Sequence, residues 1–166
     1  MTTPNSNQPN PAPSLSGQPS ELPTDLTIET AFHRRIFKLL VAAVPSDVLP
    51  PRGVAGQVDW KTRGLVSRLI ERGAVSSALG ELTYVPLTPA VMPAADEPFH
   101  LILVGVGQSE NGRPGIESAR KALSAAAKAA PGLGVDSVGL SRADFGDLAE
   151  ADIRKAFKGM ELWISP

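Results

Sequence analysis

The chain has 166 residues, of which 42% are hydrophobic and 20% are charged, and its formal net charge is −1. This composition is typical of one globular domain with a real core, and it offers no basic field that would attract nucleic acid or anionic lipid. The absence of cysteine excludes disulfides, thiolate metal sites and cysteine nucleophiles. No apolar run approaches the roughly 20 residues that cross a bilayer, and no secretory signal is recognisable, so we expect a cytoplasmic protein without a membrane partner.

Residues 1–24 differ in composition from the rest of the chain. They hold six prolines among Asn, Gln, Ser and Thr, and Leu15 and Leu22 are their only sizeable aliphatic residues. Such a segment cannot bury enough apolar surface to offset its ordering entropy, so we predict a disordered tail. It can serve as a tether, or as a docking peptide for a partner. The spacing of Pro9, Pro11 and Pro13 favours an extended polyproline conformation, without a basic flank.

We predict a single domain over residues 25–166. Apolar and polar residues alternate over residues 26–30, which indicates a short edge strand. Residues 36–44 are rich in aliphatic and β-branched side chains and stop at Pro45, so we predict a second strand there, although a helix over residues 31–44 also fits the spacing. Residues 46–56 contain several prolines and glycines and are predicted as a loop.

The next segment, residues 57–72, is predicted as one helix. Leu65, Val66, Leu69 and Ile70 recur at helical spacing and form one apolar face. Asp59 and Arg63 are spaced to pair on the helix surface, and Gly73 suits the left-handed position after the last turn. Gly64 falls in the middle of this helix, which indicates either a close approach by another element or an imperfect helix.

Residues 99–107 are the segment around which the rest of the chain is organised. Leu101 to Val104 are apolar in succession, which is typical of an interior strand buried on both faces. Before it, residues 79–87 are predicted as a strand, and Pro86 either limits its end or places it near an edge of the sheet. Residues 88–98 are predicted as a loop. After it, the alanine-rich residues 116–130 are predicted as a helix that lies close to the sheet.

The last third of the chain continues the alternation of strands and helices. We predict short strands at residues 135–140 and 160–164, with a helix between them that Asp147 caps. The predicted order of elements is that of an α/β protein with helices layered on a mixed sheet.

Few side chains suggest chemistry. His33 and His100 are the only histidines and have no carboxylates at ligand spacing, so we predict no metal site and no catalytic residue. Helix capping and solvation account for the carboxylates between residues 144 and 152. Gly105-Val106-Gly107 resembles the start of a dinucleotide fingerprint, but Glu110 stands where the third glycine would fall.

The loop of residues 105–115 is therefore open to two interpretations. It can serve only to turn the chain from strand to helix, or it can hold a phosphate at the N-terminus of the following helix. In the second case the candidate ligand-binding residues are Gly105, Gly107, Asn111 and Arg113. Arg113 would attract a phosphate and Glu110 would repel it. We predict no bound cofactor.

Several stretches together resemble one known family. Gly53-Val54-Ala55-Gly56-Gln57-Val58-Asp59-Trp60 and Arg63-Gly64-Leu65-Val66-Ser67-Arg68-Leu69-Ile70 look like the first helix of the N-terminal domain of the leucyl aminopeptidases, the cytosolic hexameric zinc peptidases. Gly80-Glu81, Leu103-Val104-Gly105-Val106-Gly107, the alanine-rich helix and Val135-Asp136-Ser137-Val138 continue the match in order. The resemblance implies a macro-domain-like, three-layer α/β/α fold.

The resemblance also limits the expected activity. In that family two metal ions, a lysine and an arginine lie in a C-terminal domain with an Asn-Thr-Asp-Ala-Glu-Gly-Arg-Leu stretch, and this sequence contains no such stretch. No catalytic residue is carried over, and the resemblance implies a stand-alone relative of a domain that serves chiefly oligomer contacts and, in some members, DNA binding.

Two classes of function follow from the sequence. The favoured one is a non-catalytic interaction or regulatory module that self-associates or binds a protein partner, such as an aminopeptidase-type catalytic chain. The alternative is a macro-domain-type nucleotide or ADP-ribose binder or hydrolase that uses the loop of residues 105–115. The charge balance makes a nucleic-acid partner the weaker expectation.

Overall fold

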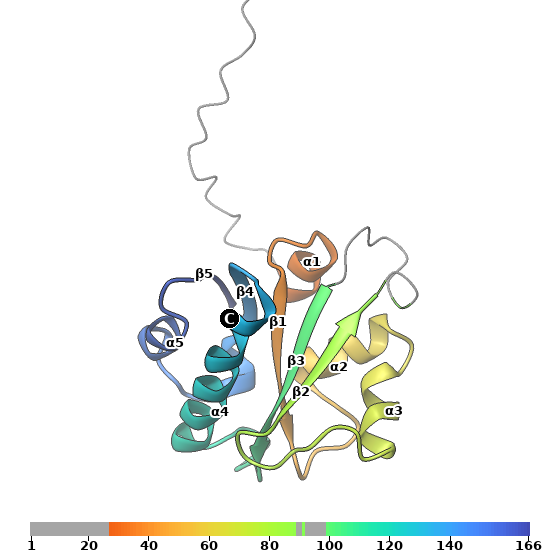
Figure 1. Cartoon of the computed structure of the whole chain (residues 1–166). Helices are drawn as coiled ribbons and strands as arrows, with labels where there is room; N and C mark the ends of the chain where they lie inside the picture. The colour runs from red at the N-terminus through yellow and green to blue at the C-terminus, as the bar shows by residue number, and fades with distance from the viewer. Residues whose placement is uncertain (1–26, 89–90, 92–98) are drawn as a thin grey trace, which may run out of the picture.

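The computed structural model describes residues 27–88, 91 and 99–166 and contains one five-stranded sheet (Figure 1). The strands lie in the order β2-β3-β1-β4-β5. They are β1 (Leu39–Pro45), β2 (Leu82–Leu87), β3 (Phe99–Gly107), β4 (Ser137–Ser141) and β5 (Glu161–Ser165). Only β2 is antiparallel to its neighbour, so the sheet is mixed, as predicted.

Helices cover both faces of the sheet and make it the middle of three layers (Figure 1). On one face lie α1 (Ile28–His33), α2 (Gly53–Lys61) and α3 (Leu65–Glu71), and on the other α4 (Ile116–Ala129) and α5 (Glu150–Ala156). Because alternate residues of a strand point to opposite faces, β1 contributes Leu40 to one core cluster and Val41 to the other. The predicted three-layer α/β/α architecture is confirmed.

Strand β3 spans the predicted residues 99–107 and lies between β2 and β1. Its residues Leu101 to Val104 are all at most 2% exposed, so both faces are buried, as predicted. The edge position predicted from Pro86 is also confirmed, since β2 is the first strand of the sheet.

The first element is a helix, and the prediction of an edge strand over residues 26–30 was wrong for the part that the structure describes. Ile28, Ala31 and Phe32 share one face of α1 and are each at most 5% exposed. The Thr27 side chain caps the helix by accepting a hydrogen bond from the Thr30 N–H at 3.2 Å. The buried residues of this segment are three and four positions apart, as in a helix, and the alternation of apolar and polar residues did not indicate its structure.

The predicted helix over residues 57–72 is two helices, α2 and α3, and α2 already begins at Gly53 inside the predicted loop. Arg63 and Gly64 both have positive φ, 54° and 83°, which ends α2 and redirects the chain. Of the two predicted reasons for Gly64, the imperfect helix is the nearer, because the helix is interrupted there by a left-handed backbone. The predicted left-handed Gly73 is confirmed, with φ 66°.

Asp59 has a different partner from the one predicted. Its carboxylate accepts hydrogen bonds from the Ser67 N–H at 2.8 Å and the Ser67 hydroxyl at 2.6 Å. Asp59 therefore caps the first turn of α3 and ties the two short helices together.

Other predicted boundaries need smaller corrections. The strands predicted at residues 36–44 and 79–87 begin later, at Leu39 and Leu82. The loop predicted at residues 88–98 lies almost entirely outside the described residues. The predicted cap of α5 by Asp147 was wrong, because Ala149 is the N-cap residue and makes no side-chain capping bond. None of the helices that the structure describes is long and apolar enough to cross a membrane.

Candidate functional site

The carboxyl ends of the parallel strands β1, β3 and β4 point to the same end of the sheet, and the loops that follow them meet there. Asp47, after β1, accepts hydrogen bonds from the Ser109 N–H at 2.9 Å and the Ser109 hydroxyl at 2.7 Å. These bonds lower the pKa of the Asp47 carboxyl. Open α/β sheets bind ligands at this end, so it is the place where a ligand site is expected.

The loop after β3 folds back as a tight hairpin turn. Asn111 and Gly112 both have positive φ, 54° and 78°. On either side of them, Glu110 and Arg113 exchange backbone hydrogen bonds of 2.7 and 3.1 Å. Two central residues with positive φ are the pattern of a type I′ turn, which Asn-Gly favours. This Asn-Gly signal was readable in the sequence but was not used in the prediction.

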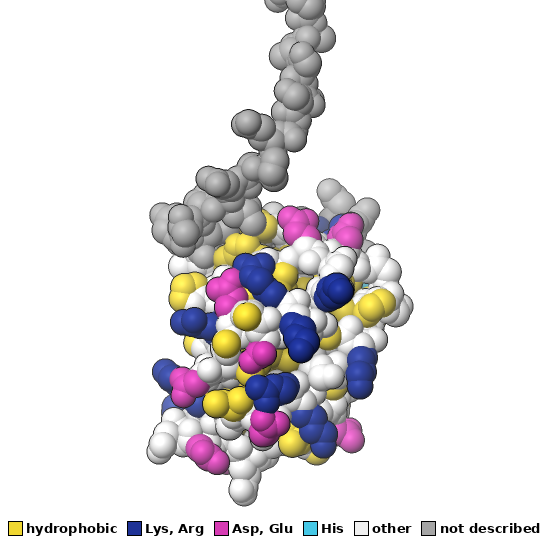
Figure 2. Space-filling view, turned by 90° about the vertical axis from the view of Figure 1, so that its left-hand side faces the viewer, with side chains coloured by type: hydrophobic (Ala, Val, Ile, Leu, Met, Phe, Trp, Pro, Cys, Tyr) yellow, Lys and Arg dark blue, Asp and Glu magenta, His cyan; other side chains and the backbone are white. Residues whose placement is uncertain are grey.

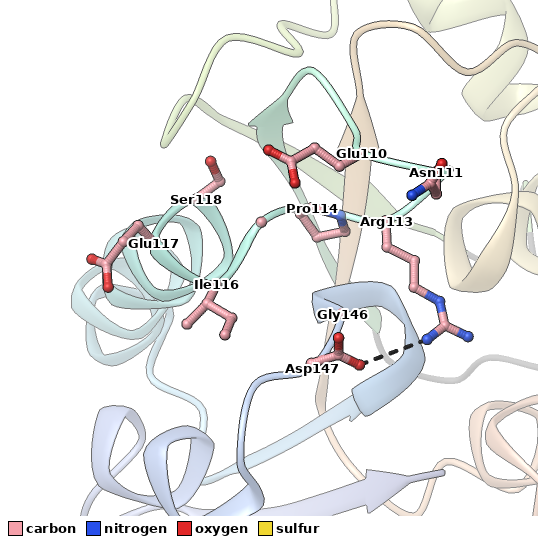
Figure 3. Close-up of a pocket in the computed structure, with 10 residues that line it drawn as sticks. Glu110, Asn111, Arg113, Pro114, Ile116, Glu117, Ser118, Gly146 and Asp147 are labelled. Carbon is pink, nitrogen blue, oxygen red and sulfur yellow. Dashed lines mark ion pairs between the residues drawn. The ribbon is translucent and has the colours of Figure 1, made fainter.

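The hairpin turn and the start of α4 line an open pocket of about 890 Å³ (Figure 3). The residues that line it are Glu110, Asn111, Arg113, Pro114, Gly115, Ile116, Glu117, Ser118, Gly146 and Asp147. Gly115 is the N-cap residue of α4 and provides no side-chain cap. The first backbone N–H groups of α4 therefore face a pocket in which an anion could accept hydrogen bonds.

The charges around this pocket oppose an anion. Glu110, Glu117 and Asp147 bring three carboxylates to its lining, and Arg113 brings the single cationic side chain. The Arg113 guanidinium points toward Asp147, with 3.7 Å between Nη1 and Oδ1, so its charge is already shared (Figure 3). The helix N-terminus attracts a phosphate, whereas the excess of carboxylates repels it.

The structure brings two of the four predicted ligand-binding residues to this pocket, Asn111 and Arg113. Gly105 and Gly107 do not line it. A Cβ atom at Gly105 would lie 2.1 Å from the Ala78 carbonyl oxygen, so this glycine allows the chain before β2 to pack against β3. Gly107 has φ 71° at the end of β3 and donates to the Ser77 carbonyl at 3.0 Å.

Asp144, one of the carboxylates that the sequence analysis explains by helix capping and solvation, lies at this end of the sheet. It lies in the 3₁₀ turn Arg142–Phe145 after β4 and is half-buried. Its carboxylate accepts from the Val54 N–H in the first turn of α2, at 3.3 and 3.2 Å. A Cβ atom at Gly53 would lie 2.1 Å from Asp144 Oδ1, so the glycine is what lets the carboxylate reach the helix.

Burial raises the pKa of Asp144 from its ordinary value of 3.8 to about 7, although hydrogen bonds from Val54 and Ala43 act in the other direction. Arg52 and Arg113 line the same cavity, which has a volume of about 170 Å³. A carboxyl that changes charge near neutral pH can act as an acid or base. Here its visible contact is the hydrogen bond that it accepts from the Val54 N–H in the first turn of α2. In the sequence, the position of Asp144 just after a buried strand was the feature that could have indicated a place at this end of the sheet.

Of the two histidines, His100 contacts the side chain of Tyr84. His100 Nδ1 lies 2.9 Å from the Tyr84 hydroxyl, and the two rings stack with centroids 5.8 Å apart. Within residues 27–88, 91 and 99–166, no group of three or more His, Cys, Asp or Glu side chains could hold a metal ion.

Comparisons with known proteins give a family and a fold. Residues 41–163 match the model of the cytosol aminopeptidase family, N-terminal domain. The macrodomain of Mycobacterium tuberculosis DarG matches with a TM-score of 0.59 and 18% identity, over 78% of this chain and 89% of that one. The macrodomain of Thermus aquaticus DarG matches with a TM-score of 0.58, at the same identity and coverage. The fold is therefore macro-domain-like, as predicted.

A third solved structure, Thermosipho africanus DarTG in complex with ADP-ribose, matches with a TM-score of 0.55 and 10% identity, over 78% of this chain and 38% of that one. A comparison with curated protein sequences gives no match.

Proposed function

The chain belongs to the cytosol aminopeptidase family through the N-terminal domain that it matches, and we propose that it is a non-catalytic interaction module that associates with a second copy of itself. A protein partner, such as an aminopeptidase-type catalytic chain, would use the same surface. We place this activity in the cytoplasm. The observation that carries the proposal is an exposed apolar strip on the edge strand β2.

Strand β2 has one covered and one uncovered face. Val85 and Leu87 are buried in the core under α2 and α3. The alternate residues Leu82, Tyr84 and Pro86 point the other way, and Leu82 and Tyr84 are 37% and 44% exposed. On that side α4 packs on β3, and no described helix lies in front of β2 (Figure 1). We call Leu82, Tyr84, Pro86 and the neighbouring His100 the β2 face.

The outer edge of β2 adds to this surface. Among the described strands, β2 pairs only with β3, so no described strand pairs with its other edge. An unpaired edge strand is a template for pairing with another chain. Pro86 cannot donate a backbone hydrogen bond, which restricts pairing to the first part of the strand and gives it a defined register. A second copy can thus bury the β2 face and pair the edge at once.

The surface of α4 and α5 toward the β5 end of the sheet contrasts with the β2 face. Lys and Arg side chains alternate with Asp and Glu over the side that carries α4 and α5 (Figure 2). Several are paired: Arg120 with Glu117 and Asp152, and Arg154 with Glu150 at 2.6 Å. Interspersed, paired charges are typical of a solvated surface. The apolar β2 face is therefore the better candidate for a contact.

The test is the mass of the protein in solution. By sedimentation velocity, the wild-type chain should form a species larger than its 17.4 kDa monomer as concentration rises. Tyr84→Lys should shift it to monomer, because association would bury an unpaired charge. Lys128→Glu, on the exposed side of α4, is the matched control and should leave association unchanged. A monomeric wild type, or equal association in wild type and Tyr84→Lys, contradicts the proposal.

The pocket at the start of α4 favours a second candidate function, a macro-domain-type nucleotide or ADP-ribose binder or hydrolase. Two observations favour it: the uncapped N-terminus of a long helix and the fold shared with a solved protein in complex with ADP-ribose. Asn111 and Arg113 would contact the ligand. The three carboxylates in the lining count against it, so we rank it second.

Calorimetry with ADP-ribose, AMP, NAD and inorganic phosphate separates the two candidates. We expect no binding. A ligand at a hundred times its dissociation constant would raise the free energy of unfolding by roughly 2.7 kcal/mol, which a thermal shift would reveal. Binding that Arg113→Ala weakens, with Arg72→Ala outside the pocket as the control, would favour the nucleotide site over the interaction module.

A further inference from the structure

One groove on the surface belongs to neither candidate function. It has a volume of about 460 Å³ and is lined by Pro51, Arg52, Gly53, Gly56, Gln57 and Trp60. The last four lie on one face of α2, because they are three, four and seven residues apart. The opposite face of the helix carries Val54, Ala55 and Val58, which are buried in the core.

The groove has a proline at one end and an aromatic ring at the other. Gly53 and Gly56 leave the helix backbone without side chains. The loop before the helix closes in on one side, since a Cβ atom at Gly56 would lie 2.5 Å from the Pro51 carbonyl oxygen. At the other end stands Trp60, 82% exposed, whereas the second tryptophan, Trp163, stacks on Phe37 with ring centroids 5.7 Å apart.

These features fit a proline-rich peptide. Polyproline segments bind shallow, aromatic-lined grooves, in which proline rings pack on an exposed tryptophan, and they lose little entropy because the free peptide is already extended. Their carbonyls protrude and accept hydrogen bonds. The Gln57 amide and the Trp60 indole N–H can both donate such bonds.

We propose that this groove binds the proline-rich N-terminal segment of this protein, residues 1–24. The segment holds prolines at 4, 9, 11, 13, 19 and 23 and has neither Lys nor Arg. Its only charged side chain is Glu21, so it brings no cationic side chain that Arg52 at the groove would repel. The same chain thus contains both a polyproline ligand and a groove with a free tryptophan face.

The length of the segment allows this contact. The described chain begins at Thr27, so 26 residues precede it. In a polyproline conformation they span about 80 Å, at about 3.1 Å per residue. A domain of this size is about 40 Å across, so the segment reaches any point on its own domain and on a neighbouring copy. The proposal is independent of the β2 face, which lies on a different element.

Trp60 itself provides the readout, in the full-length chain. The substitution Trp163→Phe leaves Trp60 as the sole tryptophan and keeps an aromatic ring on Phe37. In this background, replacing Pro9, Pro11 and Pro13 by alanine should raise acrylamide quenching of Trp60 about twofold, as expected if docking covers about half of an indole that is 82% exposed. The control replaces Ser14, Ser16 and Ser20 by alanine and should leave quenching unchanged.

The outcomes are separable because both sets of substitutions lie outside the residues that the structure describes. Quenching that does not depend on protein concentration supports docking within one chain, and quenching that increases on dilution supports docking on a second copy. Equal quenching in the parent and the proline variant would overturn the proposal. An equal rise in the proline and serine variants would overturn it too, because proline rings would then not be what the groove recognises.

Discussion

The Asp144 carboxyl accepts a hydrogen bond from the first turn of α2. The substitution Asp144→Asn should change how the free energy of unfolding varies with pH. Asparagine keeps the size of the side chain and an oxygen that can accept from the Val54 N–H, but it never carries a charge. It therefore imitates the protonated carboxyl at every pH. The difference in unfolding free energy between the two proteins then reports the titration of Asp144.

The sign follows from the direction of the pKa shift. Burial raises the pKa of Asp144 in the folded state to about 7, against 3.8 as its ordinary value, so the protonated form is the one that folding favours. Its contribution to stability is complete below about pH 4 and is lost as the pH rises to about 7. A difference of about three pKa units corresponds to at most about 4 kcal/mol.

The assay is urea unfolding of both proteins at several pH values between 4.5 and 8. Near pH 4.5 the asparagine variant should be more stable by only about 1 kcal/mol, and by pH 8 it should be more stable by up to about 4 kcal/mol. Asp47 and Asp136, whose pKa values are lowered by Ser109 and Lys38, titrate identically in both proteins and cancel. A difference that stays constant across this range would refute the assignment of the buried carboxyl.

Two further predictions concern the cap of α3 and the close contact at Gly105. Asp59→Ala should lower the free energy of unfolding by about 1 kcal/mol, because α3 loses its cap, whereas Asp59→Asn should lose less because it can still accept from the Ser67 N–H; similar losses in both would contradict the capping role. Gly105→Ala should cost about 1–3 kcal/mol, because its methyl group would lie 2.1 Å from the Ala78 carbonyl oxygen. Gly132→Ala, which has no atom within 4 Å of its Cβ position, is the control and should be nearly neutral, as measured by thermal unfolding.

The sequence predicts elements well where one local pattern decides the structure. The unbroken apolar run of β3 has no alternative to burial on both faces, and its bounds were predicted to the residue. The regular alanine face of α4 likewise left little choice, and that helix ends one residue before the predicted limit. In both cases the local spacing and the tertiary packing favour the same conformation.

The missed features depend on contacts between distant segments. The break between α2 and α3 rests on the left-handed Arg63 and Gly64 together with a bond from Asp59 to Ser67 across the turn. Asp144 meets Val54 across 90 residues of sequence, which no spacing rule reports. At the pocket, Asn111 and Arg113 are neighbours in sequence, so their meeting was predictable, whereas the partnership of Arg113 with Asp147 was not.

The most direct test of the interaction module is hydrogen exchange of the β2 amides at low and high protein concentration. If the second copy covers the β2 face and pairs the edge, the amides of Leu82–Val85 and Leu87 should exchange more slowly at high concentration, while those of α5, toward the β5 end of the sheet, should not change. Exchange of the β2 amides that does not depend on concentration, in the presence or absence of association, would contradict the proposal that this strand is the contact.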